Sequence, residues 1–196
     1  MKDTGSSILA GICIGIAGWV NLALAGVGKG IPGAIIFAFG LLAVVHYKLR
    51  LYTGTAGFIQ SAAELPHLLW ILLGNIVGTL LVAGLARLSP LPICDNAANI
   101  LAARTAIGPL KAGLLAIGCG CIMTTAVQFG REGKYLLIIF GVPAFIICGF
   151  PHCIADAFYI LASPWSMYTP ATLLLYVALV LGNFIGCNLY RVLIKL

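Results

Sequence analysis

The segment Gly149–Asp156, which reads Gly-Phe-Pro-His-Cys-Ile-Ala-Asp, contains the residues best able to do chemistry. It interrupts a long apolar run from Tyr135 to Leu161 that otherwise has the composition of a membrane-crossing helix. Glycine and proline in such a run free backbone groups, which in a bilayer must be buried in protein or line a wet cavity. An ionisable side chain at that depth therefore indicates a functional site.

His152 is the central candidate in this segment. An imidazole can exchange a proton near neutral pH, which suits the passage of the conjugate base of a weak acid. A core histidine bonded to a carbonyl is the alternative, but the position directly after a Phe-Pro pair, where a helix restarts, favours a functional role. Asp156 follows one helical turn later and could orient the imidazole and raise its basicity, or could pair with Lys48 or Arg50.

A second interruption, Leu51-Tyr52-Thr53-Gly54, lies in another apolar run. Thr-Gly-Thr is a poor helix interior, so we expect a loop inside a broken segment. The Thr53 hydroxyl could donate to an anion or satisfy a freed carbonyl, and we expect Thr53 at the position that mirrors His152. Asn75 and Asn183 could contact a substrate or bond the broken backbone, and the second role is favoured.

Apolar and basic residues near the interruptions could complete a site. Four apolar side chains could form constrictions, although plain packing would also explain them: Phe37, Leu41, Phe145 and Phe150. Arg104 and Lys111 could raise the local concentration of anions in an outer vestibule. Their alternative role is snorkelling at the membrane interface, which is favoured more for Lys111 than for Arg104.

The composition is that of a membrane protein. Of 196 residues, 62% are hydrophobic and 8% are charged, whereas about a quarter are charged in soluble domains. Continuous apolar runs predict membrane-crossing helices and not the alternating strands of a barrel. The first residues, MKDTGSS, lead directly into an apolar segment, so we expect no cleavable signal. The net charge of +6 is scattered, so no nucleic-acid partner is expected.

Six apolar segments are predicted to cross the bilayer: about 7–25, an interrupted 31–63, 66–85, 110–127, an interrupted 135–161, and 171–193. One sizeable polar connection separates Arg87 from Pro109. The basic residues predicted on the inner face are Lys2, Lys48, Arg50, Arg131, Lys134, Arg191 and Lys195, against Lys29, Arg87, Arg104 and Lys111 on the outer face. This excess predicts cytoplasmic N- and C-termini.

The two halves of the chain resemble each other. Gly11–Gly18 matches Gly113–Gly120, the second segment's break matches the fifth's, and Gly74-Asn75 matches Gly182-Asn183. Matches in the same order predict an internal repeat, and three spans per half require the repeats to be inverted. Corresponding broken segments indicate a central permeation site. We therefore expect an all-α membrane protein with one channel domain, 1–196, with repeats at about 7–86 and 107–195.

The pattern as a whole resembles the formate/nitrite transporter family, from about Ile8 to Leu193. The Leu-aromatic-Thr loop, the Gly-Phe-x-His-x-Ile-Ala segment and the Gly-Asn motifs carry this resemblance. It implies an aquaporin-like protomer, a homopentamer and one pore per protomer for small monovalent anions such as formate, nitrite or hydrosulfide. We also expect an integral protein of a bacterial inner membrane, with no cofactor and no metal.

The resemblance assigns roles to individual residues. His152 resembles the central pore histidine, with Thr53 and Asn183 as its polar companions, and Arg104 resembles a basic vestibule residue. Phe37, Met123 and Phe145 fall where the outer constriction is expected, and Leu41, Leu51 and Tyr52 fall at the inner one. The departures are Pro151 for a glutamate, Asp156 for an asparagine, Gly120 for an asparagine, and Lys48-Leu-Arg50 in place of an acidic residue.

The sequence thus predicts a channel or transporter for small anions of weak acids, assisted by protonation near His152. The alternative within transport is a pore for a small neutral solute or ammonium, favoured if the charges near His152 cancel. A membrane-embedded enzyme or cofactor-carrying subunit is disfavoured. The three histidines, His46, His67 and His152, are not paired at metal or haem spacing.

Overall fold

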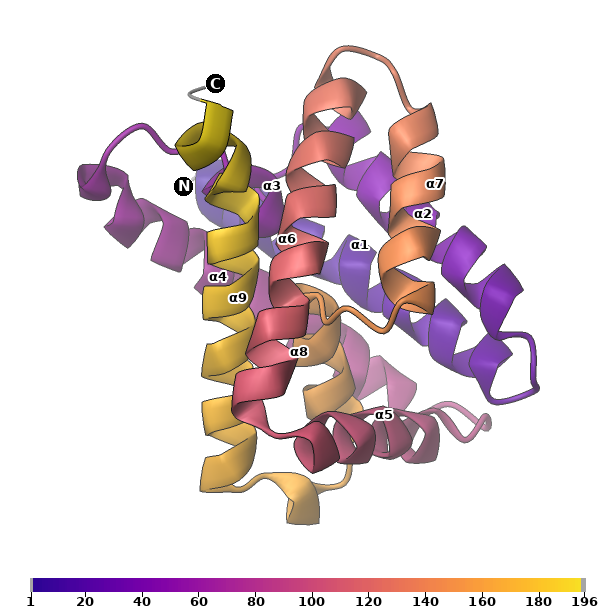
Figure 1. The fold of residues 1–196 in the computed structure, drawn as a ribbon. Coiled ribbons are helices and arrows are strands. Elements are labelled where there is room, and N and C mark those ends of the chain that lie inside the picture. Colours follow the sequence, from indigo (N-terminus) through magenta and orange to yellow (C-terminus); the bar gives the residue numbers. More distant parts are fainter. Residues whose placement is uncertain (1, 195–196) are drawn as a thin grey trace.

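The computed structural model describes residues 2–194, which form nine α-helices, two short 3₁₀-helices and no strand (Figure 1). In chain order these are α1 Lys2–Ala25, α2 Gly30–His46, α3 Thr53–Ala56, η1 Ala62–Glu64, α4 Leu65–Ala86, α5 Ile93–Ile107, α6 Pro109–Arg131, α7 Leu136–Ile147, α8 Cys153–Ala162, η2 Trp165–Met167 and α9 Pro170–Ile194. Lys195, predicted on the inner face, lies outside the described residues, as does the side chain of Lys2.

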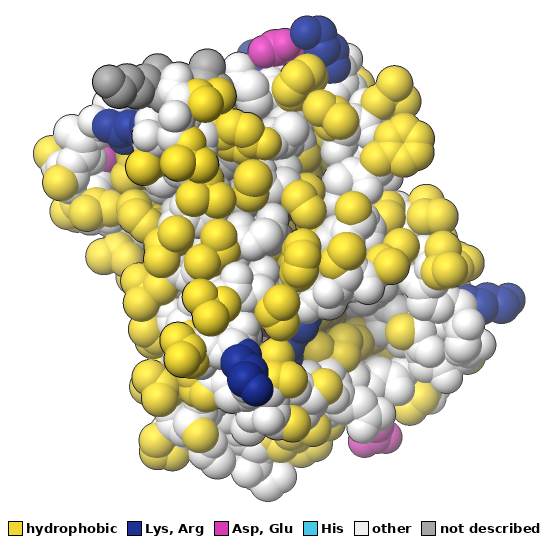
Figure 2. All heavy atoms as spheres, in the orientation of Figure 1, with side chains coloured by type: hydrophobic (Ala, Val, Ile, Leu, Met, Phe, Trp, Pro, Cys, Tyr) yellow, Lys and Arg dark blue, Asp and Glu magenta, His cyan; other side chains and the backbone are white. Residues whose placement is uncertain are grey.

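The helices have the length and surface of membrane-crossing elements. Helices α1, α4, α6 and α9 are long and apolar enough to cross a bilayer, and α2, α7 and α8 are shorter apolar helices. Figure 2 shows hydrophobic side chains covering most of one face, with Lys and Arg near its upper and lower parts. On α4 and α9, the exposed apolar side chains include Leu69, Leu73, Leu173 and Leu181. Such a surface is suited to lipid, and the all-helical membrane class is confirmed.

The long helices form two close pairs, α1 with α4 and α6 with α9, and the second pair lies side by side in Figure 1. Glycines permit this approach: a Cβ on Gly78 would collide with the Ile8 carbonyl oxygen, and one on Gly186 with the Ile117 carbonyl oxygen. Small residues let helix backbones approach closely in membranes. The glycines that follow the Gly-Asn pairs therefore allow close helix packing.

The contacts of the two pairs correspond, but in a different register from the one that the sequence match predicts. Gly11 packs against the carbonyl of Asn75, and Gly120 packs against the carbonyl of Asn183. Gly11 thus corresponds to Gly120 and not to Gly113, a difference of about two helical turns. The predicted register was wrong because both helices are rich in glycine, so a slipped alignment still pairs small residues.

The connection between α4 and α6, predicted only as a polar connection, contains a helix. Helix α5 follows Pro92 and buries Ile93, Ala97 and Leu101, which recur every fourth residue. Its mixed composition hides this apolar stripe from a search for long apolar runs. The helix lies at the lower end of the molecule in Figure 1 and packs against α8, which places Arg104 near the break in the fifth segment.

Candidate functional site

Two interruptions in the apolar helices meet inside the molecule. Helix α2 ends at His46 and α3 begins at Thr53, whereas α7 ends at Ile147 and α8 begins at Cys153. The Thr53 Oγ1 atom and the His152 Nε2 atom lie 2.9 Å apart although 99 residues separate them in the chain. Both side chains are buried. The structure therefore brings the two central candidates into direct contact.

The imidazole of His152 is held at the N-terminus of α8. His152 is the N-cap residue, and its Nδ1 atom accepts a hydrogen bond of 3.2 Å from the Ala155 N–H. In a neutral imidazole the nitrogen that accepts carries no proton, so the proton is on Nε2. Nε2 then donates to Thr53 Oγ1, which leaves the hydroxyl hydrogen of Thr53 available to another acceptor.

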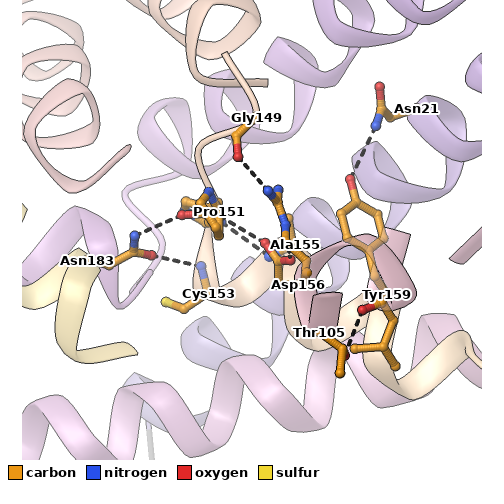
Figure 3. Close-up of polar contacts among 12 residues, drawn as sticks. Asn21, Thr105, Gly149, Pro151, Cys153, Ala155, Asp156, Tyr159 and Asn183 are labelled. Carbon is orange, nitrogen blue, oxygen red and sulfur yellow. Dashed lines mark hydrogen bonds and ion pairs between the residues drawn. The ribbon is translucent and has the colours of Figure 1, made fainter. Parts of the chain in front are cut away.

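Asp156 contacts the backbone of His152 and not its ring. Its Oδ2 atom accepts from the His152 N–H at 3.0 Å, and its Oδ1 atom accepts from Arg104 Nε at 3.2 Å. The sequence left two roles open for Asp156, and the structure shows neither a bond to the imidazole nor a pairing with Lys48 or Arg50. Arg104 takes that place because the unforeseen helix α5 carries it to the break, where it also donates to the Gly149 carbonyl. Figure 3 shows Asp156 and Gly149 at this junction.

The first break is held by the side-chain amide of Asn75. Its Oδ1 atom accepts from the Tyr52 N–H at 2.8 Å. Its Nδ2 group donates to the Arg50 carbonyl at 2.9 Å and to the Ser7 carbonyl on α1 at 2.7 Å. The Tyr52 N–H and the Arg50 carbonyl, both freed by the break, are therefore satisfied without water, as burial in a membrane requires.

Asn183 holds the second break with the same geometry (Figure 3). Its Oδ1 atom accepts from the Cys153 N–H at 2.7 Å, and its Nδ2 group donates to the carbonyls of Pro151 at 3.0 Å and Ala116 at 2.8 Å. Of the two roles that the sequence leaves open for both asparagines, the structure shows backbone bonding.

The matching bonds also fix which residues of the two breaks correspond. Tyr52 corresponds to Cys153, because the N–H of each is bonded by the asparagine. Leu51 therefore occupies the position equivalent to His152, and the expectation that Thr53 mirrors His152 is wrong by two residues. The short motifs around the two breaks share too few residue types for the sequence alone to fix this register.

Aromatic rings flank the imidazole. The Phe145 ring stacks on the His152 ring with 5.7 Å between centroids, and Phe37 meets Phe145 edge-on at 6.2 Å. These rings border a cavity of about 250 Å³, which we call the outer cavity. Its other lining residues include Asn21, Arg104, Phe150, Asp156 and Tyr159. Arg104 and Asp156 pair with each other, so the charges of this cavity cancel.

A second cavity, of about 570 Å³, lies at the end of the molecule where α2 and α6 end, and we call it the inner cavity. Its polar lining residues are His46, Lys48, Arg50, Thr55, Arg131 and Tyr135. Gly54, directly after Thr53, also borders it, so the Thr53–His152 contact lies between the two cavities. This cavity differs from the outer one in its cationic lining.

The remaining candidates do not line either cavity. Leu41, Leu51, Tyr52 and Met123 are buried in the core and line neither cavity. Lys111 is exposed and does not border the outer cavity. Within residues 2–194, no three His, Cys, Asp or Glu side chains gather where they could hold a metal ion.

Two polar residues of the outer cavity, Asn21 and Tyr159, were not predicted from the sequence. The Asn21 side chain donates to the Tyr159 hydroxyl at 3.3 Å across this cavity (Figure 3). An asparagine inside the otherwise apolar first segment was the signal that could have identified Asn21. Tyr159 carried no such signal, because tyrosine is common in apolar helices.

Interrupted membrane helices that meet at a buried polar site are the arrangement found in many transport proteins. A family model described as formate/nitrite transporter matches residues 2–195, and the chain belongs to this family. The resemblance noted from the motifs is thus confirmed. The family is one of channels and transporters and not of enzymes.

Individual relatives agree with this assignment. The formate channel FocA of Haemophilus influenzae is 27% identical over 79% of this chain and 64% of that protein. The formate-nitrite transporter 3 of Toxoplasma gondii is 26% identical over 93% of this chain and 44% of that protein. The chain therefore spans less than two thirds of the length of these relatives. A solved pentameric formate channel with formate bound has the same fold, with a TM-score of 0.81, 22% identity, and coverage of 99% of this chain and 95% of that one.

Proposed function

We propose that the chain forms a channel for small monovalent anions of weak acids, such as formate, nitrite or hydrosulfide. The contact between Thr53 and His152 carries this proposal, because it is a lone polar pair between two cavities, bordered by aromatic rings. The names of the relatives, a formate channel and a formate-nitrite transporter, point to formate and nitrite among these solutes.

The chemistry of passage follows from the hydrogen bonds of this pair. A bare anion is heavily penalised among apolar side chains such as Phe37 and Phe145. The free hydroxyl hydrogen of Thr53 can bond the anion. The anion accepts a proton from the solution on the entry side, directly or relayed through water linked to His152, so that the imidazole ends neutral as it began. The neutral acid then crosses the apolar slit, and it releases its proton on the other side.

The architecture belongs to the same proposal. The six predicted segments form two inverted repeats, about 7–86 and 107–195, within one channel domain, and five copies assemble around a common axis. Both termini are cytoplasmic in a bacterial inner membrane. The matching asparagine bonds at the two breaks and the pentameric relative support this arrangement.

Solute flux on the purified protein tests the function. Proteoliposomes should take up formate and nitrite faster at acidic than at neutral pH, because more of the solute is then protonated at the slit. Empty liposomes report the passive leak of the neutral acid and serve as the control. Uptake that does not exceed this leak at either pH would contradict the proposal.

A pore for a small neutral solute or ammonium is the second candidate, and one observation favours it. The Arg104–Asp156 pair, at 3.2 Å, cancels the charges beside His152 on the outer side. Osmotic swelling of the same proteoliposomes in formate, nitrite, hydrosulfide, ammonium and urea separates the candidates. Swelling in urea or ammonium, with none above the leak in formate or nitrite, would establish the second one.

A further inference from the structure

Several basic side chains line the inner cavity. Lys48, Arg50 and Arg131 border it, and none of its lining residues is acidic. Two carboxylates lie nearby, and one of them offsets a cation of the cavity, which leaves Lys48 and Arg131 as the charges in excess. Asp3 pairs with Arg50 at 3.2 Å, and Glu132 pairs with Lys134 at 2.8 Å, a hydrogen bond that lowers the pKa of Glu132.

Lys48 occupies a backbone position that favours glycine. Its φ angle is 54°, in the left-handed region, just after the end of α2. The N–H of Lys48 bonds the Val45 carbonyl at 3.2 Å, and the N–H of Leu49 bonds the Val44 carbonyl at 2.8 Å, which is the arrangement that usually ends on glycine. A charge that only sets membrane topology could lie at any nearby exposed position. The strained site therefore indicates a role for a lysine at this position.

The two arginines are fixed where they border the cavity. Arg131 donates a hydrogen bond of 2.8 Å to the carbonyl of Gly54, the residue directly after Thr53. Its guanidinium also lies over the Phe58 ring, 4.1 Å from the ring centroid. Arg50 is held by Asp3 through its Nε atom. Guanidinium groups present further N–H donors in a rigid fork that matches phosphate geometry. Among the described residues, no hydrogen bond or ion pair engages the Lys48 ammonium.

We propose that the inner cavity binds a divalent oxyanion of the phosphate or sulfate class, and that this anion blocks the inner mouth of the pore. A cavity of about 570 Å³ has room for such an anion, and a second negative charge doubles the Coulomb attraction to each cation. The binding step stands on the cavity alone. The blocking step rests on the proposed function, because the bound anion would lie beside Gly54, next to Thr53.

Sulfate is the probe for binding, because it has the charge and shape of phosphate and is not a lipid headgroup. The full chain in phosphatidylcholine nanodiscs is titrated with sulfate and with formate by calorimetry at constant ionic strength. We expect sulfate to bind about tenfold more tightly than formate, since its charge is doubled. The same titration in nanodiscs with phosphatidylglycerol tests whether a lipid phosphate occupies the cavity instead.

Lys48→Gly is the decisive variant, because glycine suits the left-handed backbone while the charge is lost. We expect it to weaken sulfate binding about two- to fivefold, the range for losing one exposed charge interaction, with thermal stability equal to or above that of the parent. Lys29→Gly is the matched control. It removes the same charge at the opposite end of α2, between Gly28 and Gly30, and should change neither quantity.

Flux supplies the second readout. Sulfate added on the side of the inner cavity should slow formate flux in the parent and slow it less in Lys48→Gly. Absence of sulfate binding, or equal weakening by both lysine variants, would overturn the binding step while formate flux above leak still supported the channel. Loss of sulfate binding in phosphatidylglycerol nanodiscs would show that a lipid phosphate occupies the cavity, and would overturn the assignment of a soluble anion to it. Bound sulfate with unchanged flux would overturn the block.

Discussion

The break between α2 and α3 and the break between α7 and α8 have the same support but present different groups. In each, one asparagine bonds an N–H and a carbonyl of the broken segment and reaches a carbonyl of a neighbouring long helix. At equivalent positions the first break has Leu51 and Thr53, whereas the second has His152 and Ile154.

This difference separates scaffold from chemistry. The asparagines and the close-packed glycines recur in both halves because both breaks have buried backbone groups to satisfy. The polar side chains occur once in each half at different positions, so they meet as one Thr–His pair and not as two similar pairs. We therefore expect matching substitutions of the asparagines or glycines to destabilise both halves alike. Substitutions of Thr53 or His152 should instead change transport and leave folding largely intact.

The largest effect is expected from removing either support. Asn75→Leu and Asn183→Leu each remove three hydrogen bonds to buried backbone. Each orphaned group costs about 1–3 kcal/mol, so both variants should lose the monodisperse folded protein on size-exclusion chromatography. Asn99→Leu, at an exposed position of α5, is the control and should stay folded. If the Asn75 variant stayed folded while the Asn183 variant unfolded, the two asparagines would not be equivalent supports.

Glycine substitutions in the helix pairs should have the next largest effect. Gly78→Ala and Gly186→Ala place a methyl group against the carbonyl oxygens of Ile8 and Ile117. Overpacking of this kind costs about 1–3 kcal/mol, so both variants should unfold at lower temperature in a detergent thermal-shift assay. Gly84→Ala on the same helix as Gly78 has no neighbour within 4 Å and should be neutral or stabilising. Equal melting of all three would show that the pairs are not close-packed.

The polar pair should affect transport more than folding. Thr53→Val keeps the shape of the side chain but removes the hydroxyl that contacts His152 Nε2. Loss of one hydrogen bond, worth about 1 kcal/mol, should slow formate uptake by proteoliposomes about five- to tenfold. Thr53→Ser keeps the hydroxyl and should retain most of the rate. Formate uptake at the parental rate in Thr53→Val would show that the Thr53 hydroxyl takes no part in transport.

The smallest effect concerns the charge beside the second break. Asp156→Asn keeps an acceptor for the His152 N–H but leaves Arg104 without its 3.2 Å partner. The outer cavity then gains net positive charge, so anion uptake at low ionic strength should rise severalfold and lose the increase in high salt. Asp95→Asn, which removes an exposed charge in the first turn of α5, should leave uptake unchanged. An unchanged rate in Asp156→Asn would show that this charge does not govern entry.

Local signals in the sequence account for much of this site. Glycine, proline and polar residues stand out inside apolar runs, so both breaks and their main residues, Thr53 and His152, were predictable. The backbone role favoured for Asn75 and Asn183 also followed from elementary chemistry, because freed groups in a membrane need partners.

Features that depend on helix placement were not predictable. Arg104 reaches Asp156 only because α5 folds back onto α8, and a single sequence carries no record of that docking. Arg131 was predicted only as an inner-face charge, because its contact with the Gly54 carbonyl joins residues distant in the chain. The predicted alignment of α1 with α6 was wrong for a related reason, because glycine-rich helices match one another at several offsets.

The pH dependence of formate uptake in His152→Asn tests the central claim most directly. Asparagine is among the best N-cap residues, so the variant should retain α8 and fold, while it loses the group that exchanges protons. We predict that its uptake into proteoliposomes is slower than that of the parent and rises less from neutral to acidic pH. The parental rate with the parental pH dependence would contradict passage beside this imidazole.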